Sequence, residues 1–146
     1  MRLLNDYRAS HGLRPVLISD QISEACDRHS SDMAEYGFVE HYTTNGSDWF
    51  EVGASPWDRM AASGYSYQTA KGENLAAGQA DAAAVLAAWK NSPAHDAVML
   101  NPTFGVIGVS LVQVEGSSFG YYWTADFGGY VDPAEHTVDA LGPAAQ

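Results

Sequence analysis

The sequence is poor in cysteine and in long apolar runs. Its 146 residues include a single cysteine, so no disulfide can form within the chain. Cys26 lies on an apolar stripe at helical spacing, which is typical of a small buried hydrophobic residue. No run of about 18 apolar residues occurs, although a helix needs one to span a bilayer. We therefore expect neither a disulfide framework nor a membrane-spanning helix.

Basic residues are also scarce. Seven Lys and Arg stand against 18 Asp and Glu, which gives a formal net charge of −11. Nucleic acids and anionic membrane surfaces are bound largely through clustered Lys and Arg, because these side chains neutralise phosphate. The seven basic residues here are scattered along the chain. The sequence therefore argues against both partners, and the acidic surface favours solubility.

The chain has enough apolar residues for one folded domain. Hydrophobic residues make up 46% of the sequence and aromatic residues 12%. A chain of this length buries roughly 68% of its unfolded surface on folding. No signal peptide is visible, but the first residues already lie in a helical pattern. The missing signal is therefore no argument for a cytoplasmic location.

Several helices follow from apolar spacing and from capping residues. Ser19 or Asp20 can cap a long helix that Gly37 ends, and Ser55 and Asp81 can cap two more. Helical patterns cover residues 3–10, 20–36, 56–63, 82–90 and 94–100.

The strand signals are concentrated late in the chain. A β-branched run at residues 106–114 and an aromatic run at 119–127 flank a turn at 115–118, which predicts a hairpin. A short extended piece precedes them at 73–77. Helices first and a hairpin last predict an α+β fold, with a small antiparallel sheet covered by helices.

The composition changes after Gly129. The remaining residues are rich in Asp, Pro and Ala and show no period. This predicts a domain over residues 1–129 and an acidic tail or linker over residues 130–146.

Two of the five histidines are candidates for a site. His29 falls on a helical stripe beside Met33, so we expect it to be buried and hydrogen-bonded. His41 and His95 each follow a helical stretch at a loop boundary, where side chains can converge on a cleft. Their separation matches no short zinc motif such as HExxH.

An ordered series of short motifs surrounds these histidines. The series consists of Asn5-Asp6-Tyr7-Arg8, Gly12-Leu13, Asp32-Met33-Ala34, Phe38-Val39-Glu40-His41, Gly72-Glu73-Asn74-Leu75-Ala76, Trp89-Lys90-Asn91-Ser92-Pro93-Ala94-His95, Asn101-Pro102, Ile107-Gly108-Val109 and Tyr122-Trp123-Thr124-Ala125-Asp126-Phe127-Gly128. In order and spacing it resembles the bacterial branch of the CAP superfamily, the SCP-like domains related to cysteine-rich secretory proteins. The resemblance spans about residues 3–129.

The resemblance implies a three-layer α-β-α sandwich with a cleft lined by His41, Glu73 and His95. Many members of the family bind a divalent cation, often zinc, through the two histidines. Two neutral imidazoles suit Zn²⁺, and a carboxylate can either ligate or orient an imidazole. We therefore take His41, His95 and Glu73 as candidate metal residues. Two protein nitrogens leave a tetrahedral ion open to water, so such a site is weak or exchangeable.

The chain departs from the fuller family pattern. Ser92 stands where animal and plant members have a second glutamate, and Asp96 follows His95 where bacterial relatives commonly have a basic residue. We expect Asn74 to bind loop backbone. A Ser92–His95 nucleophile lacks a visible oxyanion site. The loop at residues 45–51 carries oxygen ligands without EF-hand spacing, which makes calcium there a weak hypothesis.

These observations leave several functions open. The first is a secreted or cell-surface bacterial binding module for a lipid, peptide, glycan or host molecule. The alternative is a metal-dependent hydrolase or peptidase in which Glu73 is the general base. In a purely structural alternative, His41 and His95 only hydrogen-bond across loop and sheet, with Glu73 holding one imidazolium. Whether the chain is an enzyme stays undecided at this stage.

Overall fold

The computed structural model of this chain describes residues 1–133 and 135–136. This part has an α+β fold, as the sequence predicts. Its elements are α1 (Arg2–Ser10), β1 (Leu17–Ser19), α2 (Asp20–Tyr36), α3 (Pro56–Ala62), β2 (Lys71–Ala77), α4 (Ala82–Lys90), α5 (Pro93–Met99), β3 (Val106–Gln113), β4 (Tyr121–Gly128) and β5 (Glu135–His136). No helix in this part of the chain is long and apolar enough to cross a membrane.

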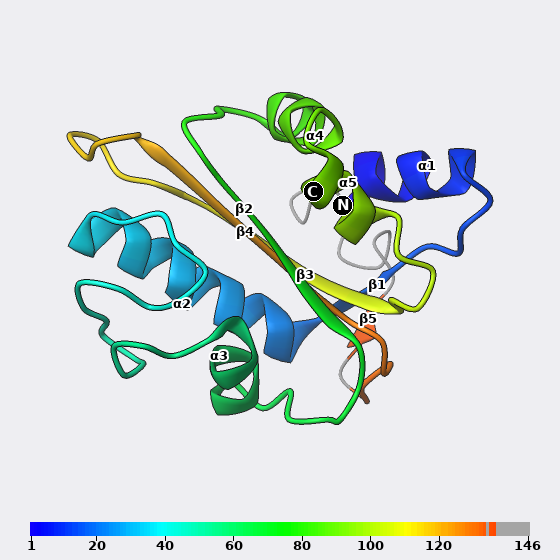
Figure 1. The fold of residues 1–146 in the computed structure, drawn as a ribbon, viewed down its shortest axis with the longest axis horizontal. Helices are drawn as coiled ribbons and strands as arrows, with labels where there is room; N and C mark the ends of the chain where they lie inside the picture. Colours follow the sequence, from blue (N-terminus) through cyan, green and yellow to red (C-terminus); the bar gives the residue numbers. More distant parts are fainter. Residues whose placement is uncertain (134, 137–146) are drawn as a thin grey trace.

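The strands form one mixed sheet with helices on both faces. Their order is β2-β4-β3-β1-β5, so β2 lies at one edge. β3 pairs antiparallel with β4 and parallel with β1. Figure 1 shows α2 and α3 on one face and α1, α4 and α5 on the other. The α-β-α sandwich implied by the family resemblance is therefore confirmed.

Alternation along β4 divides the core between the two faces. Trp123, Ala125 and Phe127 pack with residues of α1, α4 and α5. Tyr122 packs with Met33 of α2 on the opposite face. Because side chains of a strand alternate between faces, Asp126 shares the α2 face with Tyr122. A carboxyl group is thereby placed under the long helix.

Local capping fixes the helices that carry the site. The Ser19 hydroxyl accepts a hydrogen bond from the backbone N–H of Ile22 at 3.3 Å, and Gly37 ends α2 in the left-handed region with φ 73°. A capping box of Ser55 and Asp58 starts α3. These predicted boundaries are confirmed.

The structure adds two strands that the sequence patterns missed. β1 and β5 have three and two residues, which is too short to show a period. They pair with each other, and the buried Asp132 accepts a hydrogen bond from the Ser19 hydroxyl at 2.9 Å. Asp132 and β5 therefore contact the domain although they follow residue 129, and the division into domain and tail stays a prediction. Residues 134 and 137–146 of the predicted tail lie outside the described residues.

Candidate functional site

The candidate site lies beside β2, the edge strand. His41 follows α2 in the loop that leads to α3, and its Nδ1 lies 2.8 Å from Oε1 of Glu73 on β2. The His41 side chain is 53% exposed, whereas that of Glu73 is 2% exposed. An ionised Glu73 accepts a hydrogen bond from Nδ1 and fixes the imidazole tautomer. Nε2 is then the His41 nitrogen left for a ligand.

A buried arginine holds Glu73 from its other side. Nη2 of Arg59, on α3, lies 2.8 Å from Oε2 of Glu73, and the arginine side chain is fully buried. Nη1 of Arg59 donates to the carbonyl oxygens of His41 at 2.7 Å and of Ala54 at 3.2 Å. One guanidinium therefore anchors both the glutamate and the backbone of the loop that carries His41. Both Glu73 oxygens have partners.

Sequence reasoning missed Arg59. Its helix has only seven residues, so no period distinguishes a buried position from an exposed one. A buried arginine needs a carboxylate partner, but no pattern in the chain links Arg59 with Glu73.

A second carboxyl group lies next to Glu73. Asp126 on β4 is the register partner of Glu73, is fully buried, and accepts no hydrogen bond at either carboxyl oxygen. Burial, and then the negative charge of Glu73, raise the pKa of Asp126 well above its usual range. Burial also raises the pKa of Glu73, while a hydrogen bond from the protonated Asp126 and the charge and hydrogen bond of Arg59 oppose that change. With a single arginine for two carboxyl groups, Glu73 beside Arg59 ionises more readily, and Asp126 keeps its proton more readily.

His95 approaches from the opposite layer. It lies on α5, and Nδ2 of Asn74 donates to its backbone carbonyl at 3.0 Å. Asn74 therefore binds backbone, as expected, but that of helix α5 and not of a loop. Burial, and then the proximity of His41, lower the pKa of the His95 imidazole. The ring is accordingly neutral at neutral pH and offers a lone pair to a cation.

The three predicted residues do not form a closed three-ligand cluster. The ligand atoms of His41, Glu73 and His95 do not all lie within 4.8 Å of one another. Among the described residues, a different group of three meets this distance condition. His41 and Glu73 are hydrogen-bonded, and His95 is close enough to His41 for its pKa to respond. The arrangement therefore offers two imidazoles as ligands, with Glu73 orienting one of them.

A cavity opens directly beside the His41–Glu73 pair. Its volume is about 540 Å³. It is lined by His41, Tyr42, Ser55, Pro56, Trp57 and Glu73. A ligand in this cavity would contact the outer part of the His41 ring, so the cavity and the imidazole form one site.

The group that meets the metal-ligand distance criterion is acidic. Asp32 and Glu35 of α2 and Asp48 of the following loop bring their carboxylate oxygens within 4.8 Å of one another, so they could hold a metal ion. Asp32 is buried, whereas the other two are exposed. The backbone N–H of Asp48 donates to Asp32 at 3.1 Å, and the Tyr36 hydroxyl donates to Asp48 at 2.6 Å.

The sequence pattern indicated only part of this acidic group. The weak calcium hypothesis at residues 45–51 included Asp48 but neither residue of α2. Asp32 and Glu35 are three positions apart on a helix, which places them on one face. That spacing could have indicated a pair of acidic residues on α2. It could not have indicated that Asp48 of the loop lies beside them.

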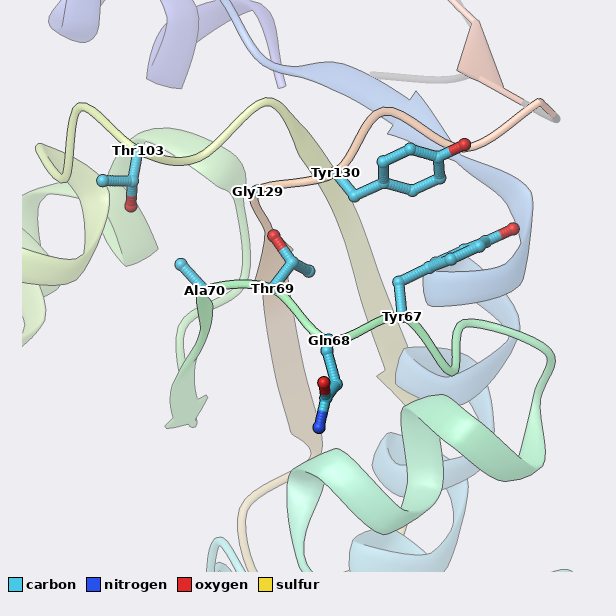
Figure 2. Close-up of a pocket in the computed structure, with 7 residues that line it drawn as sticks. All are labelled: Tyr67, Gln68, Thr69, Ala70, Thr103, Gly129 and Tyr130. Atoms are coloured by element: carbon cyan, nitrogen blue, oxygen red, sulfur yellow. The ribbon is translucent and has the colours of Figure 1, made fainter.

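A larger cavity lies elsewhere in the fold. It has a volume of about 620 Å³ and contains none of the predicted site residues. Figure 2 shows its lining residues, Tyr67, Gln68, Thr69, Ala70, Thr103, Gly129 and Tyr130. The rings of Tyr67 and Tyr130 lie 4.3 Å apart between centroids. Because this lining contributes no histidine, cysteine or carboxylate side chain, we do not assign the site here.

Comparisons with known proteins agree on one family. Residues 1–127 match the family model described as CAP, the cysteine-rich secretory protein family. The chain is 37% identical over 127 residues to Bacillus subtilis YkwD, and 29% identical over 109 residues to the Bacillus subtilis membrane protein YlbC. The match to YkwD includes 87% of this chain and 44% of YkwD. The match to YlbC includes 75% of this chain and 29% of YlbC.

Two solved structures share the fold. An outer surface protein of Borrelia burgdorferi is similar with a TM-score of 0.75 and 20% identity, over 89% of each chain. An extracellular protein of Bacillus anthracis that contains an SCP domain is similar with a TM-score of 0.72 and 26% identity. That match covers 88% of this chain and 38% of the other.

Proposed function

The chain belongs to the cysteine-rich secretory protein (CAP) family, and we propose that it is an extracellular binding module whose cleft holds a divalent cation between His41 and His95. The observation that carries the proposal is the chain of contacts from Arg59 to Glu73 to His41. It fixes one imidazole through its Nδ1 and leaves Nε2 for a ligand. Metal-ligating histidines are typically oriented in this way by a carboxylate.

The residues present fit a weak zinc site. Both histidines can supply neutral nitrogens, and the lowered pKa of His95 favours its neutral form. A tetrahedral Zn²⁺ bound by two protein nitrogens would keep two positions for water or for a ligand atom. The cation would then link the protein to a ligand in the adjacent cavity and exchange readily.

An extracellular location rests on similarity. The Borrelia and Bacillus anthracis proteins are described as outer-surface and extracellular. The chain spans less than half the length of its Bacillus subtilis relatives, so the activity of a whole protein of that kind is likewise part of this proposal.

A metal-dependent hydrolase is the weaker alternative. It requires Glu73 to take a proton from water, but this side chain is 2% exposed and both its oxygens are hydrogen-bonded. The geometry supports Glu73 as the residue that orients His41. Hydrolysis that is lost with a chelator and with Glu73→Gln would favour the alternative over the binding module.

The decisive experiment is a zinc titration by calorimetry at about pH 7.5. We expect one saturable site that His41→Ala/His95→Ala abolishes. Glu73→Gln should weaken zinc binding roughly 10- to 100-fold, as loss of an orienting partner typically does. Affinity should also fall as the solution is acidified, because protonated imidazole cannot ligate.

The matched control is the acidic group. Glu35→Gln/Asp48→Asn should leave zinc affinity unchanged, since neither side chain contacts the cleft histidines in the structure described. Binding that survives the double histidine variant but disappears in this one would place the ion at the acidic group and contradict the proposal.

A further inference from the structure

Exposed apolar side chains gather in the segment that joins α2 and α3 and in the first turn of α3. Tyr42, Trp49, Val52 and Trp57 are 60%, 47%, 67% and 44% exposed. Figure 1 shows this segment as a long loop between the two helices. Isolated exposed apolar residues are common on proteins, but several on one loop typically mark a contact surface. We call residues 42–58 the loop surface.

Two cavities lie on the loop surface. The first is the one beside His41, of about 540 Å³, and the second has about 550 Å³. Neighbouring residues line different cavities: Ala54 and Asp58 line the second, while Ser55 and Trp57 line the first. The two hollows therefore flank the start of α3. One extended ligand could reach both.

Every Asp, Glu, Lys or Arg side chain that lines the two cavities is acidic. Glu51 and Asp58 line the second cavity and Glu73 the first, whereas no Lys or Arg lines either one. The backbone N–H and hydroxyl of Ser55 lower the pKa of Asp58 and keep it ionised. Two cations lie nearby, and both are paired: Arg59 is buried and bound to Glu73, and Arg28, 6.0 Å from the centroid of the Trp49 ring, is bound to Glu24. Anionic ligands are disfavoured here and cationic ones favoured.

From these contacts we propose that the loop surface docks a peptide segment in which lysine or arginine stands next to an apolar side chain. The apolar side chain enters the cavity that Trp49 and Val52 line, and the cation lies against Glu51 and Asp58. This inference rests on the proposed binding function and names its ligand class. Among the classes left open by the sequence, it disfavours lipids with anionic head groups and acidic glycans.

The test compares two capped pentapeptides, one alternating lysine with leucine and one alternating glutamate with leucine. Binding is followed by calorimetry in the presence of EDTA, so that no cation is required. We expect saturable binding of the lysine peptide, weakening as salt is added, and no binding of the glutamate peptide. Equal binding of the two peptides, or none of either, would overturn the proposal.

Variants locate the binding surface. Trp49→Ala should weaken binding about tenfold or more, as loss of an aromatic anchor does. Glu51→Gln should weaken it about two- to fivefold, the range for one exposed ion pair. Phe119→Ala and Glu115→Gln, in the turn between β3 and β4, are matched controls because they line neither cavity. Equal losses in the turn variants would show that adsorption is nonspecific and would overturn the proposal.

The same variants separate this inference from the proposed cation site. Trp49→Ala should retain zinc binding, and His41→Ala/His95→Ala should retain most of the peptide binding measured in EDTA. Zinc binding without peptide binding would reject the loop surface alone. Peptide binding without zinc binding would reject the cation site alone.

Discussion

Two groups of carboxyl side chains in this protein lie near the same loop but differ in their surroundings. Glu73 and Asp126 are buried between the sheet and α2, with Arg59 as their cation. In the acidic group, Glu35 and Asp48 are exposed, and no Lys or Arg is ion-paired with them in the part of the chain that is described. The buried pair can hold only one negative charge, whereas the exposed group can carry more.

This difference separates two uses of acidic residues. A buried carboxylate with both oxygens engaged has a fixed orientation, so Glu73 can position the His41 ring. Exposed carboxylates leave lone pairs for cations from solvent, but water screens their charges. The closeness of acidic side chains therefore does not by itself indicate whether they position another residue or bind a cation. Burial and the nearest cation decide between the two uses.

Removal of the buried cation should have the largest effect. Arg59→Met leaves a buried negative charge without its partner and frees the carbonyl oxygens of His41 and Ala54. We expect a loss of about 3–5 kcal/mol in the free energy of unfolding, measured by urea denaturation. Arg28→Met is the control: Arg28 forms a partly exposed ion pair with Glu24 at 2.6 Å, and its loss should cost about 0.5 kcal/mol. If both variants lost the same free energy of unfolding, the distinction between the buried and the exposed ion pair would be wrong.

The second prediction concerns the proton on Asp126. Its pKa is raised in the folded state, so wild-type stability is fully present below the unfolded pKa of about 3.9 and is lost as pH rises through the folded pKa. Asp126→Asn cannot ionise and should escape this loss. Its stability relative to wild type should grow by about 1.4 kcal/mol per pH unit above about pH 4, up to the folded pKa.

Urea denaturation of both proteins between about pH 4 and pH 8 measures this difference. Asparagine keeps the shape of the protonated carboxyl and can donate to Glu73, so packing should change little. A difference that stays constant over this range would mean that Asp126 is ionised in the folded protein at neutral pH.

The smallest effect should come from the exposed group, and with the opposite sign. The Tyr36 hydroxyl lowers the pKa of Asp48, so the stability that this carboxylate contributes is present above its unfolded pKa and is lost as pH falls through the folded pKa. Asp48→Asn should therefore be slightly less stable than wild type at neutral pH and equally stable in strong acid. Tyr36→Phe removes the same hydrogen bond and should reproduce the loss. If either variant were more stable than wild type at neutral pH, the prediction that this carboxylate stabilises the fold would be wrong.

Much of the fold could be predicted from the sequence because its signals are local. Capping at Ser19, Ser55 and Asp81, and the glycine at Gly37, set helix ends through contacts within a few residues. The buried positions of Cys26 and His29 also followed from helical spacing, and both are fully buried. The three-layer arrangement followed from the family resemblance.

The sequence named the residues of the candidate site but not their geometry. The motif series named His41, Glu73 and His95, and the structure shows how Glu73 contacts the first of them. Whether these residues bind a cation stays a prediction. The roles of Arg59 and Asp126 were not foreseen, because each depends on a contact between distant segments.

The sequence by itself therefore determined the helix ends and the β3–β4 hairpin, because capping and alternation act over short stretches of chain, while the family resemblance named His41, Glu73 and His95 as candidates. Only the tertiary structure decided which carboxyl group meets which cation. The register of β2 with β4 sets Asp126 against Glu73, and the packing of α3 against α2 brings Arg59 to the same place. Burial at that junction then fixes where the proton and the charge reside, since desolvation depends on the whole surrounding fold.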